Sequence, residues 1–257
     1  MLFRNAVFIG AGRVATRMAV AMAGAGIKIE QVYSRTLDHA RDLAQITGAN
    51  ACTDLLAITS NADLYVISVP DAALATVVSE LKMTNAFVVH TSGTMPMEVL
   101  RKFEHFGVFY PLQTMTKEYE LDFSEVPLLI EADSASYEER LAYLAKTLKS
   151  KFYHVNSEKR CQAHIAAVFA CNFTNHMYHI ASDILKQAEL PFDLLLPLIR
   201  ETARKIETDK PSNIQTGPAA RNDVNVMQTH IDMLEDPVYK EIYQLVSKSI
   251  STQALKK

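Results

Sequence analysis

The sequence predicts an α/β protein in which a doubly wound parallel sheet is followed by an all-helical C-terminal domain. Three observations support this fold class. Up to about residue 155, short apolar runs alternate with stretches of helical spacing, which is typical of a parallel sheet covered on both faces. Beyond that point only helical patterns occur. Four of the eight glycines lie within the first 26 residues, where a tight turn between a strand and a helix would need them.

Strands and helices alternate through the N-terminal part. AVFIG, over 6–10, is a strand because the apolar run stops at glycine, and the small and apolar residues of 13–25 recur at helical spacing. The same patterns predict a strand over 29–34 and a helix over 37–47. The next elements are a strand over 64–69 that Pro70 ends, a helix over 72–81, a strand over 87–90, a short helix over 96–103, strands over 108–110 and 127–131, an amphipathic helix over 136–149 and a closing strand over 152–155.

The C-terminal part contains helical patterns separated by loops. The expected helices cover about 158–187, 192–207, 222–234 and 237–250. The segment 209–218 is a loop, because it contains two prolines and a glycine. We therefore expect a sheet domain over 1–155 and a helical domain over 156–257, with the boundary near Asn156.

Composition excludes several classes of protein. Of the 257 residues 49% are hydrophobic, which argues against disorder, and 29 acidic against 26 basic residues give a net charge of −3, which argues against nucleic-acid binding. No apolar run approaches the ~18 residues of a membrane helix. Cys52, Cys161 and Cys171 form no C-x-x-C pair, which argues against a disulfide framework or a cysteine zinc site. With no signal-peptide pattern at the N-terminus, we expect a cytoplasmic protein.

A glycine-rich turn follows the first strand. Its sequence G-A-G-R-V-A matches the dinucleotide fingerprint G-x-G-x-x-A between a strand and a helix, and so predicts a Rossmann-type sheet. Gly10 permits the tight turn, Gly12 lets the backbone approach a pyrophosphate, and the helix N-terminus supplies free N–H donors. The expected cofactor contacts here are Gly10, Ala11, Gly12, Arg13 and Val14. The alternative is a tight turn without a ligand.

The end of the second strand bears on the choice of cofactor. An NAD enzyme usually places Asp or Glu here to accept hydrogen bonds from the ribose. This chain instead has Ser34, Arg35 and Thr36, whose hydroxyls and guanidinium suit a 2′-phosphate. The sequence therefore favours NADP(H) over NAD(H), unless Ser34 or Thr36 only caps the following helix.

Two further strand ends carry residues expected at the cofactor or the substrate. Val69 and Pro70 close one strand where such loops border the nicotinamide, and Asp71 after them is either part of the site or a helix cap. The next strand ends in H-T-S-G, where His90 could bond a substrate carbonyl or carboxylate and Ser92 could contact the cofactor. The alternative is that Thr91 or Ser92 caps the helix that follows.

Candidate substrate contacts follow later in the chain. Gln113 and Thr114 are polar groups beside an apolar anchor, although a rigid proline turn explains them equally well. On the long helix, His164 and Asn172 are eight residues apart, about 80° around an α-helix, so both can border one cleft. His176 and His179 lie three residues apart on the same helix, a spacing that could bind a metal. Because no third ligand is near them in the sequence, we expect no metal site.

The loop T-G-P-A-A-R-N-D precedes one of the last helices. Arg221 could hold an anionic substrate or the phosphates of the cofactor. Asn222 or Asp223 is equally plausible as a helix cap.

The chain as a whole resembles a known family. It shares, in order, the segments G-A-G-R-V-A, Y-S-R-T, S-V-P-D, H-T-S-G, P-L-Q-T, an Asn on a long helix, and T-G-P-A-A-R-N-D. The family comprises bacterial Rossmann-like proteins with a C-terminal helical domain of unknown function, often labelled as candidate NADP oxidoreductases. Its wider relatives include pyrroline-5-carboxylate reductases, deazaflavin-dependent NADP reductases and β-hydroxyacid dehydrogenases. The last group carries a catalytic Lys four residues before the Asn; Val168 stands there in this chain, which argues against that chemistry. The family motif also usually has Gly where Asn222 stands.

The motifs and the resemblance together predict an NADP(H)-dependent reductase of a small carbonyl or imine. His90 or His164 is expected to donate a proton, Arg221 to hold a carboxylate, and Asn172 to lie in the same site between the domains. The alternative is a sensor or scaffold that binds NADP(H) without catalysis. Because the long helix is apolar on more than one face, we also expect a homodimer through the helical domain.

Overall fold

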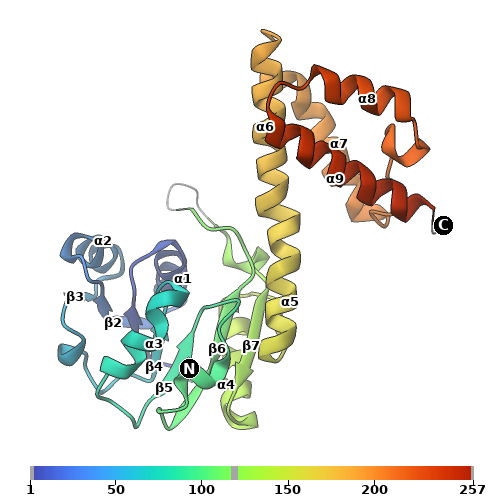
Figure 1. Ribbon diagram of the computed structural model, residues 1–257. Helices are drawn as coiled ribbons and strands as arrows, with labels where there is room; N and C mark the ends of the chain where they lie inside the picture. The colour runs from blue at the N-terminus through green and yellow to red at the C-terminus, as the bar shows by residue number, and fades with distance from the viewer. Residues whose placement is uncertain (1–2, 117–120, 256–257) are drawn as a thin grey trace. The chain divides into compact units, whose positions relative to one another are not determined.

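Eight strands form a single sheet among the residues that the computed structural model describes, 3–116 and 121–255 (Figure 1). The strands lie in the order β3-β2-β1-β4-β5-β6-β7-β8. They are β1 (Asn5–Ile9), β2 (Lys28–Tyr33), β3 (Asn50–Cys52), β4 (Leu64–Ile67), β5 (Phe87–His90), β6 (His105–Pro111), β7 (Leu128–Ala132) and β8 (Phe152–His154). All neighbouring strands are parallel except β6 and β7. The chain builds the sheet outward from β1 to β3 on one side and then crosses back to place β4 on the other side of β1, so the strand order reverses between β1 and β4.

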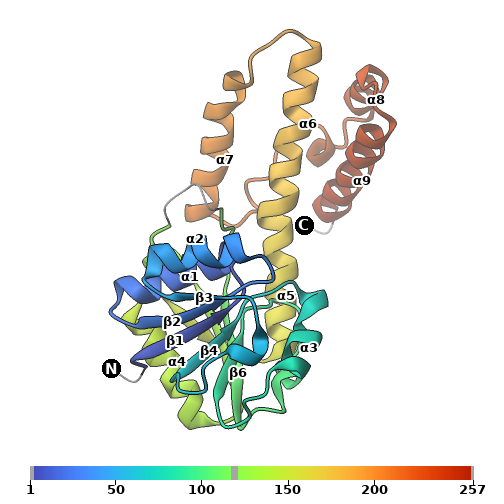
Figure 2. The same ribbon diagram turned by 90° about the vertical axis from the view of Figure 1, so that its left-hand side faces the viewer.

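Helices cover both faces of this sheet (Figure 2), which confirms the predicted doubly wound fold. The helices involved are α1 (Arg13–Gly24), α2 (Leu37–Thr47), α3 (Asp71–Glu80) and α4 (Ala135–Thr147). Apolar side chains of α1, α2 and α4 belong to one buried cluster, and those of α3 belong to another. Successive strand side chains alternate between these clusters, with Phe8 in the first and Val7 and Ile9 in the second.

Three details differ from the predicted sheet. β3 was not expected, because its three residues, Asn-Ala-Cys, form no apolar run. The predicted helix over 96–103 is only a 3-10 turn, Met97–Leu100, since the chain enters β6 at His105. β7 runs antiparallel to β6, because the described residues between them hold only the 3-10 turn Phe123–Glu125 and no helix to carry a parallel crossover.

The predicted long helix is continuous in the structure, with a change of pitch near its middle. α5 (Ser157–Ala167) leads into a π-helical segment (Val168–Phe173) and then into α6 (Thr174–Gln187). The expected angle of about 80° between His164 and Asn172 assumed α-helical spacing throughout, so it does not hold across the π turn. The later helices are α7 (Leu196–Thr208), α8 (Val224–Met233) and α9 (Pro237–Ala254).

Backbone contacts divide the chain into two compact units, residues 1–171 and 172–257. The predicted boundary at 155 lies one residue past the end of β8, but α5 is part of the first unit. The side chain of Arg160 on α5 is fully buried and bonds to Glu131 of β7, which ties the helix to the sheet.

The two units differ in how many of their side chains are buried. Among the described residues of the helical unit, only Ile180 and Ala219 are buried. Large apolar side chains remain exposed on its surface, for example Leu198 of α7 at 63% and Leu245 of α9 at 67%. Within the described ranges, no helix has both the length and the apolar character to cross a bilayer.

Candidate functional site

The turn between β1 and α1 has the geometry that its glycines predict. Gly10 has φ +121°, and a Cβ atom placed on it would lie 2.0 Å from the carbonyl oxygen of Ser68. Its amide donates a hydrogen bond to the Tyr33 carbonyl at 2.8 Å, and the amide of Ser68 donates to the Ile9 carbonyl at 2.8 Å. The ends of β1, β2 and β4 are thereby held so close together that only glycine fits at position 10.

A cavity of about 260 Å³ opens at these strand ends. Its lining residues are Gly10, Ala11, Gly12, Arg13, Tyr33, Ser34, Arg35, His39, Ser68, Val69, Pro70, Ala73 and Val77. Eight of them were predicted as cofactor contacts, so the structure brings three separate sequence motifs into one cavity. Val14, Thr36 and Ser92, also predicted, are not part of this lining.

The cavity suits an anionic ligand. Arg13, Arg35 and His39 line it, and its described lining contains no acidic residue. A Cβ on Gly12 would meet no atom within 4 Å, so the backbone at the N-terminus of α1 is open to a ligand. In the described part of the chain the Arg35 guanidinium makes no hydrogen bond or ion pair, which leaves its charge for a ligand. His39 was not predicted, although it lies early in the helix that follows Arg35.

The capping alternative for the second strand is only partly realised. Thr36 occupies the N-cap position of α2, but its side chain makes no capping hydrogen bond. The Ser34 hydroxyl accepts a hydrogen bond from the Thr36 amide at 3.3 Å. The hydroxyl of Thr36 is therefore not committed to the helix end.

The residues of the segment H-T-S-G differ in their burial and in their hydrogen bonds. His90 is fully buried, and burial lowers its pKa to about 3, assisted by the charge of Arg160. Its Nδ1 accepts a hydrogen bond from the Ser92 amide at 3.1 Å. The Ser92 hydroxyl accepts from the amides of Thr94 and Met95, but it does not cap the following turn, whose N-cap residue is Pro96, so the capping alternative is not realised. Thr91 donates to the Ser68 hydroxyl at 3.0 Å and links the ends of β4 and β5.

His164 lies beside Gly93 and Tyr110, within the first compact unit. The Tyr110 hydroxyl and His164 Nδ1 are 2.9 Å apart, and the two rings meet edge to face. A Cβ on Gly93 would lie 2.8 Å from Cγ of His164 and 3.0 Å from Cζ of Tyr110. Burial raises the pKa of Tyr110, and the charge of Arg160 partly opposes this shift. The loop after Tyr110 was predicted to contact the substrate, but the side chain of Tyr110 was not.

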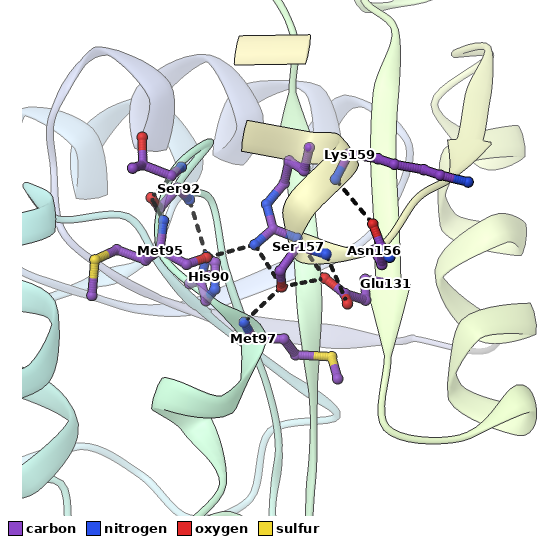
Figure 3. A network of polar contacts seen from close by, with 10 residues as sticks. His90, Ser92, Met95, Met97, Glu131, Asn156, Ser157 and Lys159 are labelled. Carbon is purple, nitrogen blue, oxygen red and sulfur yellow. Dashed lines mark hydrogen bonds and ion pairs between the residues drawn. The ribbon is translucent and has the colours of Figure 1, made fainter. Parts of the chain in front are cut away.

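A buried ionic network fixes α5 against the sheet (Figure 3). Arg160 donates from Nη1 to Glu131 Oε2 and from Nη2 to the Met95 carbonyl, both at 2.5 Å. The Ser157 hydroxyl donates to Glu131 Oε2 at 2.9 Å and accepts from the Met97 amide at 3.0 Å. The network joins β7, α5 and the segment after His90, so it holds His164, one turn beyond Arg160, in place. Arg160, Glu131 and Ser157 were not predicted as site residues.

The predicted residues of the helical unit and of the loop after Tyr110 are exposed. Asn172 lies in the π-helical segment, and Arg221 lies in the 3-10 turn Ala219–Arg221. Asn222 has φ 54° and ψ 39°, a left-handed conformation that glycine and asparagine tolerate best. Asp223 caps α8 by accepting from the Val226 amide, as one alternative predicts. Gln113 is exposed, and its side chain accepts a hydrogen bond from the next amide.

His176 and His179 are the histidine pair whose spacing could suit a metal. The rings of His176 and His179 are 5.9 Å apart, and His179 faces Asp183 at 3.5 Å. Across residues 3–116 and 121–255, no three His, Cys, Asp or Glu side chains are grouped so that they could hold a metal ion.

Family models match two parts of the sequence. Residues 4–114 match a Rossmann-like domain, and residues 126–250 match a domain of unknown function (DUF2520). Comparison with curated proteins gives no match.

Solved structures resemble the whole chain. A "putative NADP oxidoreductase" from Bacteroides fragilis shares 45% identity at a TM-score of 0.90, over 97% of this chain and 98% of that one. An imine reductase from Myxococcus stipitatus in complex with NADP+ shares 16% identity at a TM-score of 0.68, over 98% and 93%. A 1-pyrroline-5-carboxylate reductase from Streptococcus pyogenes shares 12% at 0.62, over 98% and 97%. The last two likenesses show a common fold.

Proposed function

Because the chain belongs to the family in which a Rossmann-like domain precedes the domain of unknown function matched at 126–250, we propose that it is an NADP(H)-dependent oxidoreductase that reduces a small carbonyl or imine. The observation that carries the proposal is the cavity at the ends of β1, β2 and β4, which combines the glycine turn with two arginines and lacks acidic lining. The name of the Bacteroides fragilis protein supports it.

The cavity residues, together with Val14, Thr36 and Ser92 outside its lining, would hold the parts of the cofactor. The open backbone at Gly12 and the N-terminus of α1 would hold the pyrophosphate, with Ala11, Arg13 and Val14 beside it. Ser34, Arg35 and Thr36, together with His39, would hold the 2′-phosphate. Val69 and Pro70 would border the nicotinamide, with Ser92 on the neighbouring strand end. NADP(H) supplies the hydride chemistry when bound.

The remaining residues are proposed to serve the substrate. Of the two predicted proton donors, we favour His164, because His90 is fully buried and its Nδ1 already accepts a hydrogen bond from the Ser92 amide. We propose that Arg221 holds a substrate carboxylate and that Asn172 adds a polar contact. Both side chains are exposed and so available to a ligand.

The binding preference for NADPH tests the cofactor assignment. We expect NADPH to bind ~10–100 times more tightly than NADH, because charge-assisted hydrogen bonds contribute about 1.5–3 kcal/mol. Arg35→Ala should remove most of that preference by weakening NADPH alone. Calorimetric titration at one fixed salt concentration measures both affinities, since phosphate contacts depend on salt.

Arg41→Ala is the matched control, because Arg41 is also exposed on α2 but lies outside the cavity lining. It should leave both affinities within about twofold of the wild type. Equal affinities of the wild type for NADPH and NADH would refute the assignment.

We further propose a homodimer formed through the helical unit. A domain whose described residues include two buried side chains, Ile180 and Ala219, has too small a core to fold stably by itself. Its apolar groove of about 270 Å³ is lined by residues of α6 and α9, such as Ile184 and Val246. A second copy of the chain offers the same apolar surface, and an isologous pairing would cover both.

Light scattering should give twice the chain mass of 28.7 kDa at micromolar concentration. Val246→Glu should shift the protein toward monomers, because Val246 lines the groove and is 47% exposed, so the change places a charge in the proposed interface. Leu56→Glu is the control: Leu56 is similarly exposed, at 58%, but belongs to the sheet unit. A monomeric wild type, or equal behaviour of both variants, would contradict the proposed interface.

A cytoplasmic location also remains part of the proposal. Cys52, Cys161 and Cys171 are all free thiols in the structure, which suits a reducing compartment.

A further inference from the structure

We propose that Tyr110 and His164 form a proton relay, in which the Tyr110 hydroxyl holds His164 in its Nε2–H tautomer and restores the proton that the ring gives up. The relay rests on the proposed reductase function and adds to it a positioning residue for the donor.

The contact between the two side chains places the Tyr110 hydroxyl at Nδ1 of His164, which leaves Nε2 for the substrate. The Tyr110 hydroxyl lies 2.9 Å from Nδ1, within hydrogen-bond distance, and His164 is only partly buried. A neutral imidazole carries one hydrogen, and the nitrogen that accepts a hydrogen bond is the one without it. Burial raises the pKa of Tyr110, so its hydroxyl stays protonated, and in the relay this hydroxyl is the donor to Nδ1. Nε2 of His164 then bears the hydrogen.

The surroundings hold the two rings together. Gly93 packs so tightly against both rings that a methyl group at that position would overlap His164. Arg160, one turn earlier on α5, is anchored to Glu131 and to the Met95 carbonyl, which prevents the helix from sliding along the sheet. His164 therefore has little freedom to leave Tyr110.

The relay balances the proposed reduction. NADPH, when bound, supplies the hydride that forms the new C–H bond. The Nε2 hydrogen of His164 passes to the substrate oxygen or nitrogen, while the Tyr110 proton passes to Nδ1. The imidazole stays neutral and only changes tautomer, and the phenolate left on Tyr110 takes one proton from solvent. The charge of the buried Arg160 stabilises that phenolate, whereas burial and the charge of Asp71 oppose it.

The tautomer of His164 is measurable by NMR. In protein labelled with ¹⁵N-histidine, long-range ¹H–¹⁵N spectra distinguish Nδ1–H from Nε2–H, and His164→Gln assigns the signal. We expect a pure Nε2–H form in the wild type and a mixture of tautomers in Tyr110→Phe, which removes only the hydroxyl. Gly93→Ala should produce a similar mixture by pushing the rings apart. An Nδ1–H wild type, or an unchanged tautomer in Tyr110→Phe, would overturn the relay.

The pH dependence of NADPH oxidation gives a second test. With the relay, the neutral pair still donates a proton at alkaline pH, whereas a histidine without a second proton source donates only as the imidazolium, a form that disappears as the pH rises. Tyr110→Phe should therefore lose activity as the pH rises, by at least ~10-fold at pH 8, with NADPH affinity unchanged. If the wild type and Tyr110→Phe both oxidise NADPH with the same pH profile, the role of Tyr110 is contradicted and the reductase proposal stands. A wild type that binds NADPH and reduces nothing would instead contradict the reductase itself.

Discussion

Arg160→Met is expected to lower the free energy of unfolding by about 3–5 kcal/mol, because it leaves the Glu131 carboxylate without its partner in a largely buried site. The Arg160 side chain is 0% exposed and that of Glu131 15%. The loss also removes a hydrogen bond to the Met95 carbonyl, which then lacks that donor. Urea denaturation of the two proteins measures the difference.

Two further variants separate the ion pair from its surroundings. Lys159→Met changes the neighbouring residue on α5, whose side chain is exposed, and should stay within about 0.5 kcal/mol of the wild type. Adding Glu131→Gln to Arg160→Met should recover part of the lost stability, since the unpaired charge is removed. If Arg160→Met were as stable as Lys159→Met, the network would not anchor α5.

Gly10→Ala and Gly12→Ala are expected to separate folding from cofactor binding. At Gly10 a methyl group would overlap the Ser68 carbonyl, and φ +121° is strained for any L-residue. Strain and overpacking together should cost about 2–6 kcal/mol of unfolding free energy. At Gly12 the same methyl group meets no atom within 4 Å, so stability should change by no more than about 0.5 kcal/mol.

Binding should show a different order. Gly12→Ala places its methyl group where the pyrophosphate would approach the backbone, so NADPH affinity should fall by ~10-fold or more, about 1.4 kcal/mol. Thermal denaturation and calorimetric titration of the same two variants measure both effects. A Gly12→Ala variant that binds NADPH as tightly as the wild type would show that the phosphates lie elsewhere.

Local chemistry explains which parts of the structure the sequence could predict. The turn at Gly10 depends on the backbone freedom of glycine and on its place between an apolar run and a helix, both of which are visible in a short window. The edge strand β3 has no such signal, because an edge strand of three residues needs no apolar run. The direction of β7 depends on the length and content of the connection before it, which residue patterns indicate only weakly.

Contacts between distant segments explain what the sequence could not predict. Arg160 stands in S-E-K-R-C, a segment typical of an exposed helix start, and only Glu131 from β7 makes its burial possible. Tyr110 and His164 are 54 residues apart, so no local pattern pairs them. His90 was correctly placed at a strand end, but its complete burial was not predicted, because it depends on the elements that cover that strand.

The central claim is that the chain uses bound NADPH to reduce a small carbonyl or imine. The most direct measurement is NADPH oxidation by the purified wild type and by His164→Gln, over a panel of small imines, ketones and 2-oxo acids. We predict that the wild type oxidises NADPH with at least one member of the panel, and that His164→Gln binds NADPH equally well but is slower by about 10²-fold or more. NADPH binding without oxidation across the panel, or equal rates in the two proteins, would contradict the account and favour a protein that binds NADP(H) as a sensor or scaffold.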